Sequence, residues 1–332
     1  MNKQKLCRII RETSLPQVPV PTGETGNLQF LENIQAVFFD IYGTLFISSS
    51  GEIGALPMPA ELARELEATD DAQRHELPLA LGKKFIDLYP NSPRPSSTST
   101  AEKHATTQRH NEQDYRQCGN DLILAFQKKI YKSHVVKQQE GIPWPEVDVR
   151  KIWGEIISEK FAESGPGIFS HIDRWAIEYE VRTNPVWPMP NATDCIDRLG
   201  SANLTLGIIS NAQFYTPLLF PALMNRQLED LEISAEMQYY SYCGGRSKPD
   251  VWMFDQAAKS LAQKGITPRQ TLYVGNDMLN DILPAAQVGF RTALCAADQR
   301  SLRLREDDSR VSQTVPDIVV TNLEEVIACV LK

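Results

Sequence analysis

Several features that would place a chain in a special class are missing here. The six cysteines are scattered and include no Cys-x-x-Cys pair, so neither a disulfide framework nor a zinc cluster is predicted. No apolar run approaches the roughly 20 residues of a membrane span, and the polar N-terminus has no signal-peptide pattern. With 34 Lys and Arg against 42 Asp and Glu, the chain lacks the basic surplus of a general nucleic-acid binder. We expect a cytoplasmic protein that binds neither nucleic acid nor a membrane.

What the sequence does contain is the pattern of an α/β protein. The chain has 332 residues, 42% of them hydrophobic, which is enough for two domains. Short apolar runs, typical of strands buried on both faces, cover residues 35–40, 204–209, 271–274, 291–295 and 317–321. Helical spacings lie between these runs, and this alternation predicts a parallel sheet with helices packed against it.

Two helix boundaries are predicted from local signals. Apolar residues from Ala192 to Leu199 recur at helical spacing, and Gly200 is the expected cap. A second helix is expected to start at Ser247, because Pro249 suits a first turn and Asp250 completes a capping pattern.

The domain organisation follows from where the pattern is interrupted. Residues 34–46 and 189–332 carry the α/β pattern, whereas residues 47–188 show mainly helical periodicity and form an expected inserted domain. Within this insertion, residues 91–113 are rich in Ser, Thr, Pro and His and predict a flexible loop. Residues 1–33 are polar and proline-rich, and we expect a loosely held N-terminal arm.

Polar and acidic side chains follow three of the predicted strands. Asp40 ends the first, Ser210 and Asn211 end the second, and Asp277 ends the third, while Lys248 opens a helix between them. Ligands of open α/β sheets bind outside the carboxyl ends of the strands. We therefore expect these residues to meet in one crevice, although each segment alone is also a common turn or helix start.

Together these segments resemble the four motifs of the haloacid dehalogenase (HAD) superfamily. In order, they are residues 40–45 (DIYGTL), 208–211 (IISN), 248–250 (KPD) and 274–277 (VGND), with Asp281 following. The resemblance implies a doubly wound, Rossmann-like HAD core, and the insertion lies where many members carry a helical cap. It further implies a hydrolase that forms a covalent intermediate on an aspartate.

The resemblance also implies roles for individual residues. Asp40 would be the nucleophile and Lys248 would steady it, with Tyr42 also placed at the catalytic centre. Magnesium, which prefers oxygen ligands, would be held by Asp40, the Tyr42 carbonyl, Asp277 and Asp281. A small anionic substrate would be bound by Gly43, Thr44, Ser210 and Asn211.

Position 42 leaves the reaction open. Phosphatases of the family carry an aspartate there as general acid, and a tyrosine, with a pKa near ~10, is poorly matched to that duty. Tyr42 and the Ser210-Asn211 pair resemble the 2-haloacid dehalogenase branch, which needs no metal, whereas Asp277 and Asp281 favour a metal-binding phosphatase. Asn276 stands where the first metal-binding acid is usual. We expect a magnesium-dependent phosphohydrolase of a small phosphorylated metabolite, with a metal-independent dehalogenase or a catalytically weak ligand- or partner-binding protein as alternatives.

The residues that would select the substrate are the least defined. Gln213 and Tyr215 follow Ser210 closely, and Trp144, Trp153 and Trp175 of the insertion could line a pocket or simply be core. The five histidines show no ligand spacing and are given no role. The oligomeric state is left open.

Overall fold

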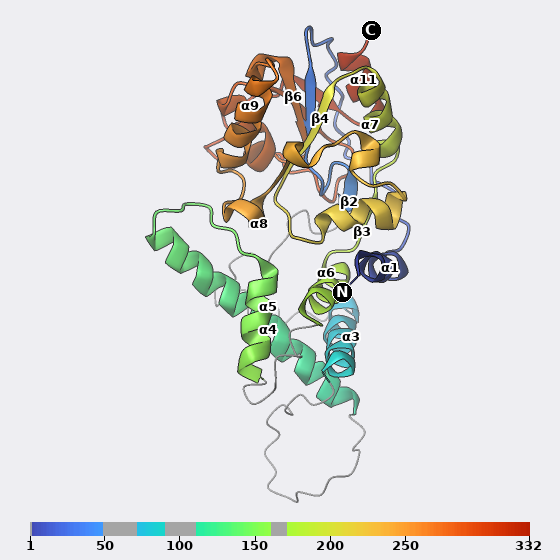
Figure 1. Ribbon diagram of the computed structural model, residues 1–332, viewed down its shortest axis with the longest axis vertical. Helices are drawn as coiled ribbons and strands as arrows, with labels where there is room; N and C mark the ends of the chain where they lie inside the picture. The colour runs from blue at the N-terminus through green and yellow to red at the C-terminus, as the bar shows by residue number, and fades with distance from the viewer. Residues whose placement is uncertain (1, 49–71, 90–110, 161–170) are drawn as a thin grey trace, which may run out of the picture.

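The computed structural model describes residues 2–48, 72–89, 111–160 and 171–332. A sheet flanked by helices occupies one end of the molecule, and the inserted helices occupy the other (Figure 1). Within the described residues, no helix is both long enough and apolar enough to cross a membrane.

The sheet has six parallel strands in the order β5–β4–β1–β6–β7–β8. Their bounds are β1 Ala36–Phe39, β4 Thr205–Ser210, β5 Gln238–Tyr240, β6 Thr271–Gly275, β7 Arg291–Cys295 and β8 Ile318–Val320. The five predicted strands are confirmed. The edge strand β5 was not predicted, because its three residues form no apolar run.

Helices cover both faces of this sheet, so the predicted doubly wound α/β fold is confirmed. They are α7 (Ala192–Ser201), α9 (Trp252–Gln263), α10 (Leu283–Gln287) and α11 (Glu324–Val330), with the short α8 (Ser241–Gly244) after β5. Successive side chains of a strand point to opposite faces. In β1, Val37 and Phe39 pack in the cluster that contains α7 and α11, whereas Ala36 and Phe38 pack with α9.

The predicted cap of α7 is wrong. Gly200 lies inside the helix, which continues to Ser201. The left-handed residue that follows is Asn203, with φ of 61°. An asparagine tolerates this conformation better than most residues, so the chain turns three residues later than predicted.

The predicted start of the next helix is also wrong, because α9 begins at Trp252. Lys248 donates its backbone N–H to the Asn211 side chain (2.7 Å) and accepts from it through its carbonyl oxygen (3.3 Å). These bonds hold the Lys248 backbone outside the helix. Asp250 still acts near the helix start, where it accepts from the Trp252 amide at 2.9 Å.

The inserted segment leaves and re-enters the core through two short antiparallel strands, β2 (Phe46–Ser48) and β3 (Val186–Pro188). Its described helices are α3 (Ala72–Leu88), α4 (Glu112–Gln139), α5 (Val149–Lys160) and α6 (Ile172–Thr183). Trp153 and Trp175 are fully buried among them, with ring centres 5.2 Å apart. These two tryptophans therefore belong to the core of the insertion.

Most of the predicted flexible loop lies outside the described residues. Its end is described, and there the expectation is wrong. Asn111 caps α4 by accepting from the Asp114 amide, and the Asp114 side chain accepts from the Asn111 amide in return. This reciprocal capping box starts the helix at Glu112.

The N-terminal arm is bound to the rest of the protein, so the prediction of a loosely held segment is wrong. It begins with α1 (Lys3–Thr13), whose buried residue Ile10 packs in the main core cluster. In Figure 1, α1 lies between the sheet end of the molecule and the inserted helices. Farther along, Asn27 and Val319 exchange backbone hydrogen bonds of 2.9 and 3.1 Å. These bonds anchor the arm beside β8.

Candidate active site

A cavity of about 340 Å³ lies at the carboxyl ends of β1, β4 and β6 and extends to the inserted segment. We call it the site cavity. Its lining from the sheet end includes Asp40, Tyr42, Asn211, Gln213, Lys248, Asn276, Asp277, Asp281 and Arg305. Its lining from the insertion includes Ile130, His134, Gln138, Trp144, Glu146 and Val147. The crevice predicted from the strand ends is therefore present.

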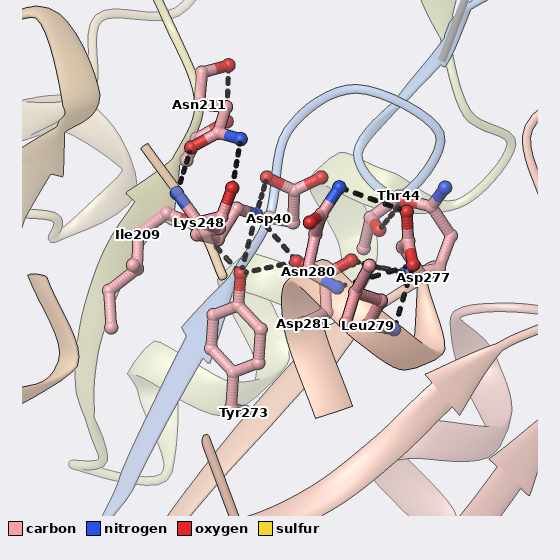
Figure 2. Close-up of polar contacts among 12 residues, drawn as sticks. Asp40, Thr44, Ile209, Asn211, Lys248, Tyr273, Asp277, Leu279, Asn280 and Asp281 are labelled. Atoms are coloured by element: carbon pink, nitrogen blue, oxygen red, sulfur yellow. Dashed lines mark hydrogen bonds and ion pairs between the residues drawn. The ribbon is translucent and has the colours of Figure 1, made fainter. Parts of the chain in front are cut away.

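Lys248 lies between the carboxylates of Asp40 and Asp281 (Figure 2), and all three residues line this cavity. Its Nζ donates to Asp40 Oδ1 at 2.7 Å and to Asp281 Oδ1 at 2.5 Å, and all three side chains are buried. Burial alone would lower the pKa of the ammonium group, but the charges of Asp281 and Asp40 outweigh it and raise the pKa. Lys248 is thus held as a cation in contact with the predicted nucleophile.

Asp40 occupies a fixed place at the end of β1. Its backbone N–H donates to the Val274 carbonyl of the neighbouring strand at 2.9 Å, which continues the sheet to this residue. The Lys248 ammonium orients one carboxylate oxygen. An ionised carboxylate beside a cation and facing a cavity is chemically suited to nucleophilic attack.

Asp281 is placed by the turn that follows β6. This π-helical turn, Met278–Ile282, returns its carboxylate to the strand end, where Oδ2 accepts from the amides of Asn276 and Asp277, both at 2.9 Å. Gly275 makes this approach possible, because an added Cβ would lie 2.4 Å from the Asp281 carboxyl carbon. Burial raises the pKa of Asp281 against the opposing charge of Lys248, and the charges of Asp40 and Asp277 add to the rise.

Asp277 has different partners from Asp281. Its carboxylate pairs with Arg305, with Nη2 to Oδ2 at 2.6 Å, and caps the following turn by accepting from the amides of Leu279 and Asn280. Arg305 was not predicted from the sequence, because it lies in a long loop without a motif. Of the two acids Asp277 and Asp281, it is therefore Asp281 whose carboxylate contacts Lys248.

A tyrosine of strand β6 also contacts Lys248 and Asp281. Tyr273 OH lies 3.1 Å from both Lys248 Nζ and Asp281 Oδ1 and donates to the Ile209 carbonyl at 2.8 Å. Burial raises its pKa well above the ordinary value, so it is a neutral hydrogen-bonding group. Its signal in the sequence was a tyrosine hydroxyl between the apolar residues Leu272 and Val274.

Three of the four predicted substrate-binding residues are not among those that line the site cavity. Thr44 is fully buried and its hydroxyl donates to Asn276 Oδ1 at 3.1 Å, while Gly43 has φ of 87°, which favours glycine. Ser210 is also fully buried. Asn211 does line the cavity, but its side chain is bonded to the Lys248 backbone. Substrate contact by these residues stays a prediction.

Tyr42 lines the cavity, but its hydroxyl is engaged elsewhere. It lies 2.9 Å from Thr216 Oγ1, which also accepts from the Gln213 amide. Burial raises the pKa of Tyr42 well above the ordinary value, and the charge of Glu180 adds to this rise. The geometry favours a wall of the cavity over a proton donor.

Replacing Tyr42 with Phe tests this interpretation. We expect turnover to change by no more than about threefold and the free energy of unfolding to fall by about 1 kcal/mol, the usual cost of one hydrogen bond. A proton donor at this position would instead contribute about 10²–10⁴-fold. Steady-state rates and urea denaturation of the two proteins measure both quantities, and a hundredfold loss of rate with unchanged stability would contradict us.

The insertion contributes cavity residues that the sequence did not reveal. Glu146 is buried in the segment before α5, and His134 reaches the cavity from α4, although the histidines were given no role.

The residues considered for substrate selection have different positions. Trp144 lines the cavity, which was one of the two alternatives given for it. Gln213 does so too, but its side-chain amide binds the Val147 carbonyl (2.8 Å) and the Val149 amide (3.1 Å), and thereby joins the insertion to the core. Tyr215 is buried in the main core cluster.

Known proteins resemble this chain in sequence. The family model described as haloacid dehalogenase-like hydrolase matches residues 34–289. The rhythmically expressed gene 2 protein of Drosophila melanogaster is 26% identical over 185 residues, 53% of this chain and 68% of that protein. Among solved structures, a dehalogenase (14% identity, TM-score 0.47) covers 91% of this chain and all of its own. A predicted phosphoglycolate phosphatase of Haemophilus somnus (14% identity, TM-score 0.42) covers 90% of this chain and 98% of its own. Because the family model spans residues 34–289, more than half of the chain, this protein belongs to the haloacid dehalogenase-like hydrolases.

Proposed function

We propose that this hydrolase removes phosphate from a small phosphorylated metabolite, with Asp40 as the nucleophile. The observation that carries the proposal is the charge of the site cavity. Among the described residues that line it on the sheet side, Asp40, Asp277 and Asp281 face two cations, Lys248 and Arg305, so carboxylates are in excess before any substrate binds. Carboxylates that share a cavity repel one another, and a bound phosphate would add further negative charge. A metal cation together with a phosphate suits this site better than a bare carboxylate substrate.

The proposed reaction has two steps. An Asp40 oxygen attacks phosphorus, the bond between phosphorus and the leaving oxygen breaks, and an aspartyl phosphate forms. Water then attacks the phosphorus, the bond to Asp40 breaks, and phosphate leaves with the aspartate restored. Lys248, 2.7 Å from Asp40, would offset the charge that develops on the transferred group.

Magnesium is the cation that the donor set fits. Among the described residues, no three acidic, histidine or cysteine side chains form a ready cage for a metal. Magnesium commonly binds through one or two carboxylates with water and substrate phosphate, which Asp40 and Asp281 could supply with the Tyr42 carbonyl. Asp277, predicted as a further ligand, would first have to leave Arg305. When bound, magnesium would neutralise charge on the phosphoryl oxygens.

Chelation tests the proposal directly. We expect phosphate release from 4-nitrophenyl phosphate to stop in EDTA and to return when magnesium is added in excess, because the carboxylate-rich cavity would otherwise repel the substrate. Calcium, which prefers more ligands and longer bonds, should restore less activity. A rate that is undiminished in EDTA would overturn the metal dependence.

A metal-independent 2-haloacid dehalogenase is the second candidate, and Tyr42 favours it. Halide leaves without taking up a proton, so dehalogenation would not need a proton donor at position 42. This reading predicts halide release from short 2-chloro and 2-bromo acids at the same rate with and without EDTA. Release of neither phosphate nor halide would favour the third reading, a protein that binds a ligand without turnover.

A further inference from the structure

The site cavity contains a buried carboxyl group that the reaction described so far does not use. We propose that Glu146 is the general acid and base of this site and performs the duty that position 42 does not. The inference rests on the proposed phosphohydrolase function. Glu146 lies in the segment that leads into α5 and lines the same cavity as Asp40, with 6% of its surface exposed.

The hydrogen bonds of Glu146 fix its carboxyl group without saturating it. Oε1 accepts from the Val147 amide at 2.8 Å and from Gln213 Nε2 at 3.4 Å, and Oε2 accepts from Ser241 Oγ at 2.8 Å. Two carboxylate oxygens offer about four lone-pair sites. Oε2 therefore retains a position that can carry a proton or accept one.

Ser241 allows both protonation states. Its hydroxyl lies 2.8 Å from Glu146 Oε2 and 3.3 Å from the Ala212 carbonyl, and its oxygen accepts from the Ala212 amide. When Glu146 is ionised, Ser241 can donate to it. When Glu146 is protonated, the Ser241 hydrogen can turn to the Ala212 carbonyl, so no buried donor is left unpaired.

The surroundings of Glu146 raise its pKa towards neutral pH. Burial raises it to about 7, opposed by the hydrogen bonds from Val147 and Ser241 and by the charge of Lys137. The other ionisable groups that face it are Glu180 of α6, Tyr215 of the main core, and His134, which shares the cavity. General acid and base catalysis is most effective when the pKa lies near the working pH.

The proton transfers balance over one turnover. In the first step, protonated Glu146 gives its proton to the leaving oxygen as Asp40 bonds to phosphorus. In the second, the Glu146 carboxylate takes a proton from the attacking water as the bond between Asp40 and phosphorus breaks. Phosphate and alcohol leave, and both carboxyl groups return to their starting states. No further reactant is required.

A leaving-group comparison separates this role from a structural one, because Glu146 also lies where the insertion contacts the core. Phenyl phosphate and 4-nitrophenyl phosphate have similar size, but only the first releases a strongly basic phenolate that needs a proton. In the 332-residue protein with magnesium added, we expect Glu146→Gln to lower kcat/KM for phenyl phosphate about 10²–10³-fold and for 4-nitrophenyl phosphate no more than about tenfold. The value of kcat/KM reports only the steps up to phosphoryl transfer, so slow hydrolysis of the aspartyl phosphate does not affect the comparison.

The pH profile and two further variants complete the test. Wild-type kcat/KM for phenyl phosphate should fall above about pH 7, where Glu146 loses its proton, and Glu146→Gln should lack this decline. Glu146→Asp, which retains an acid, should recover part of the rate. Glu180→Gln replaces a half-buried acid of α6, whose pKa desolvation also raises to about 7, and should change the rates on both substrates equally.

The outcomes are distinct. An equal loss on both substrates in Glu146→Gln, with the pH decline retained, would overturn the inference while the proposed function stands. Release of phosphate from neither substrate by the wild-type protein would overturn the proposed function and this inference together.

Discussion

Replacing Asp40 with Asn should remove phosphate release almost completely, by a factor of about 10⁴ or more, as expected for loss of a covalent nucleophile. The amide is neutral and cannot form the aspartyl phosphate. The fold should survive, because Lys248 keeps its bond to Asp281 at 2.5 Å and Asp40 is bonded to the sheet through its backbone. Initial rates with 4-nitrophenyl phosphate and thermal melting of both proteins measure the two effects.

A matched control is available at the amino end of the edge strand β8, away from the carboxyl strand ends where Asp40 lies. Asp317 lies just before β8, where it pairs with Arg291 and accepts from the Thr292 amide. Asp317→Asn should lower stability without a selective loss of turnover. If Asp40→Asn retained more than a hundredth of the wild-type rate, Asp40 would not be the nucleophile.

Replacing Lys248 with Met should have the largest effect on stability. The substitution leaves the buried carboxylates of Asp40 and Asp281 without their shared cation. Removing one partner of a buried ion pair commonly costs about 3–5 kcal/mol, and we expect a loss of this size at pH 8 in EDTA. Turnover should fall as well, by about 10²–10³-fold, since an electrostatic contact to the nucleophile is lost.

The pH dependence of this loss has a definite sign. Burial already raises the pKa of Asp281, and Lys248 opposes the rise, so removing Lys248 raises it further. An acid with a raised pKa in the folded state favours folding at low pH, and this advantage is lost as pH rises towards the folded pKa. The variant should therefore be closer to wild type at pH 5 than at pH 8 in urea denaturation. A second substitution, Asp281→Asn, should recover part of the loss, whereas a pH-independent loss would contradict the charge argument.

Local sequence patterns predicted the α/β core well, because its strands are short apolar runs that end at turns. The positions of Asp40, Asn211, Lys248 and Asp281 around one cavity followed from the rule that parallel strands present their carboxyl ends together. The helix boundaries were less predictable. At Lys248, a tertiary hydrogen bond to Asn211 competes with local capping signals and moves the start of α9 to Trp252.

The parts of the site that were missed depend on distant contacts. Arg305 reaches Asp277 from a loop 28 residues farther along the chain. Glu146 gains its environment only when the insertion meets Gln213 and Ser241 of the core. Neither residue has a spacing or a neighbour in the sequence that distinguishes it from an ordinary surface charge. Their roles required the three-dimensional structure.

Identifying the covalent intermediate tests the role of Asp40 most directly. Wild-type protein turning over 4-nitrophenyl phosphate with magnesium is quenched in acid within milliseconds, digested, and its peptides are analysed by mass spectrometry. We expect a phosphoryl group on Asp40 that is absent from the Asp40→Asn protein. A phosphoryl group on another residue, or its absence from wild-type protein during rapid turnover, would show that Asp40 is not the nucleophile.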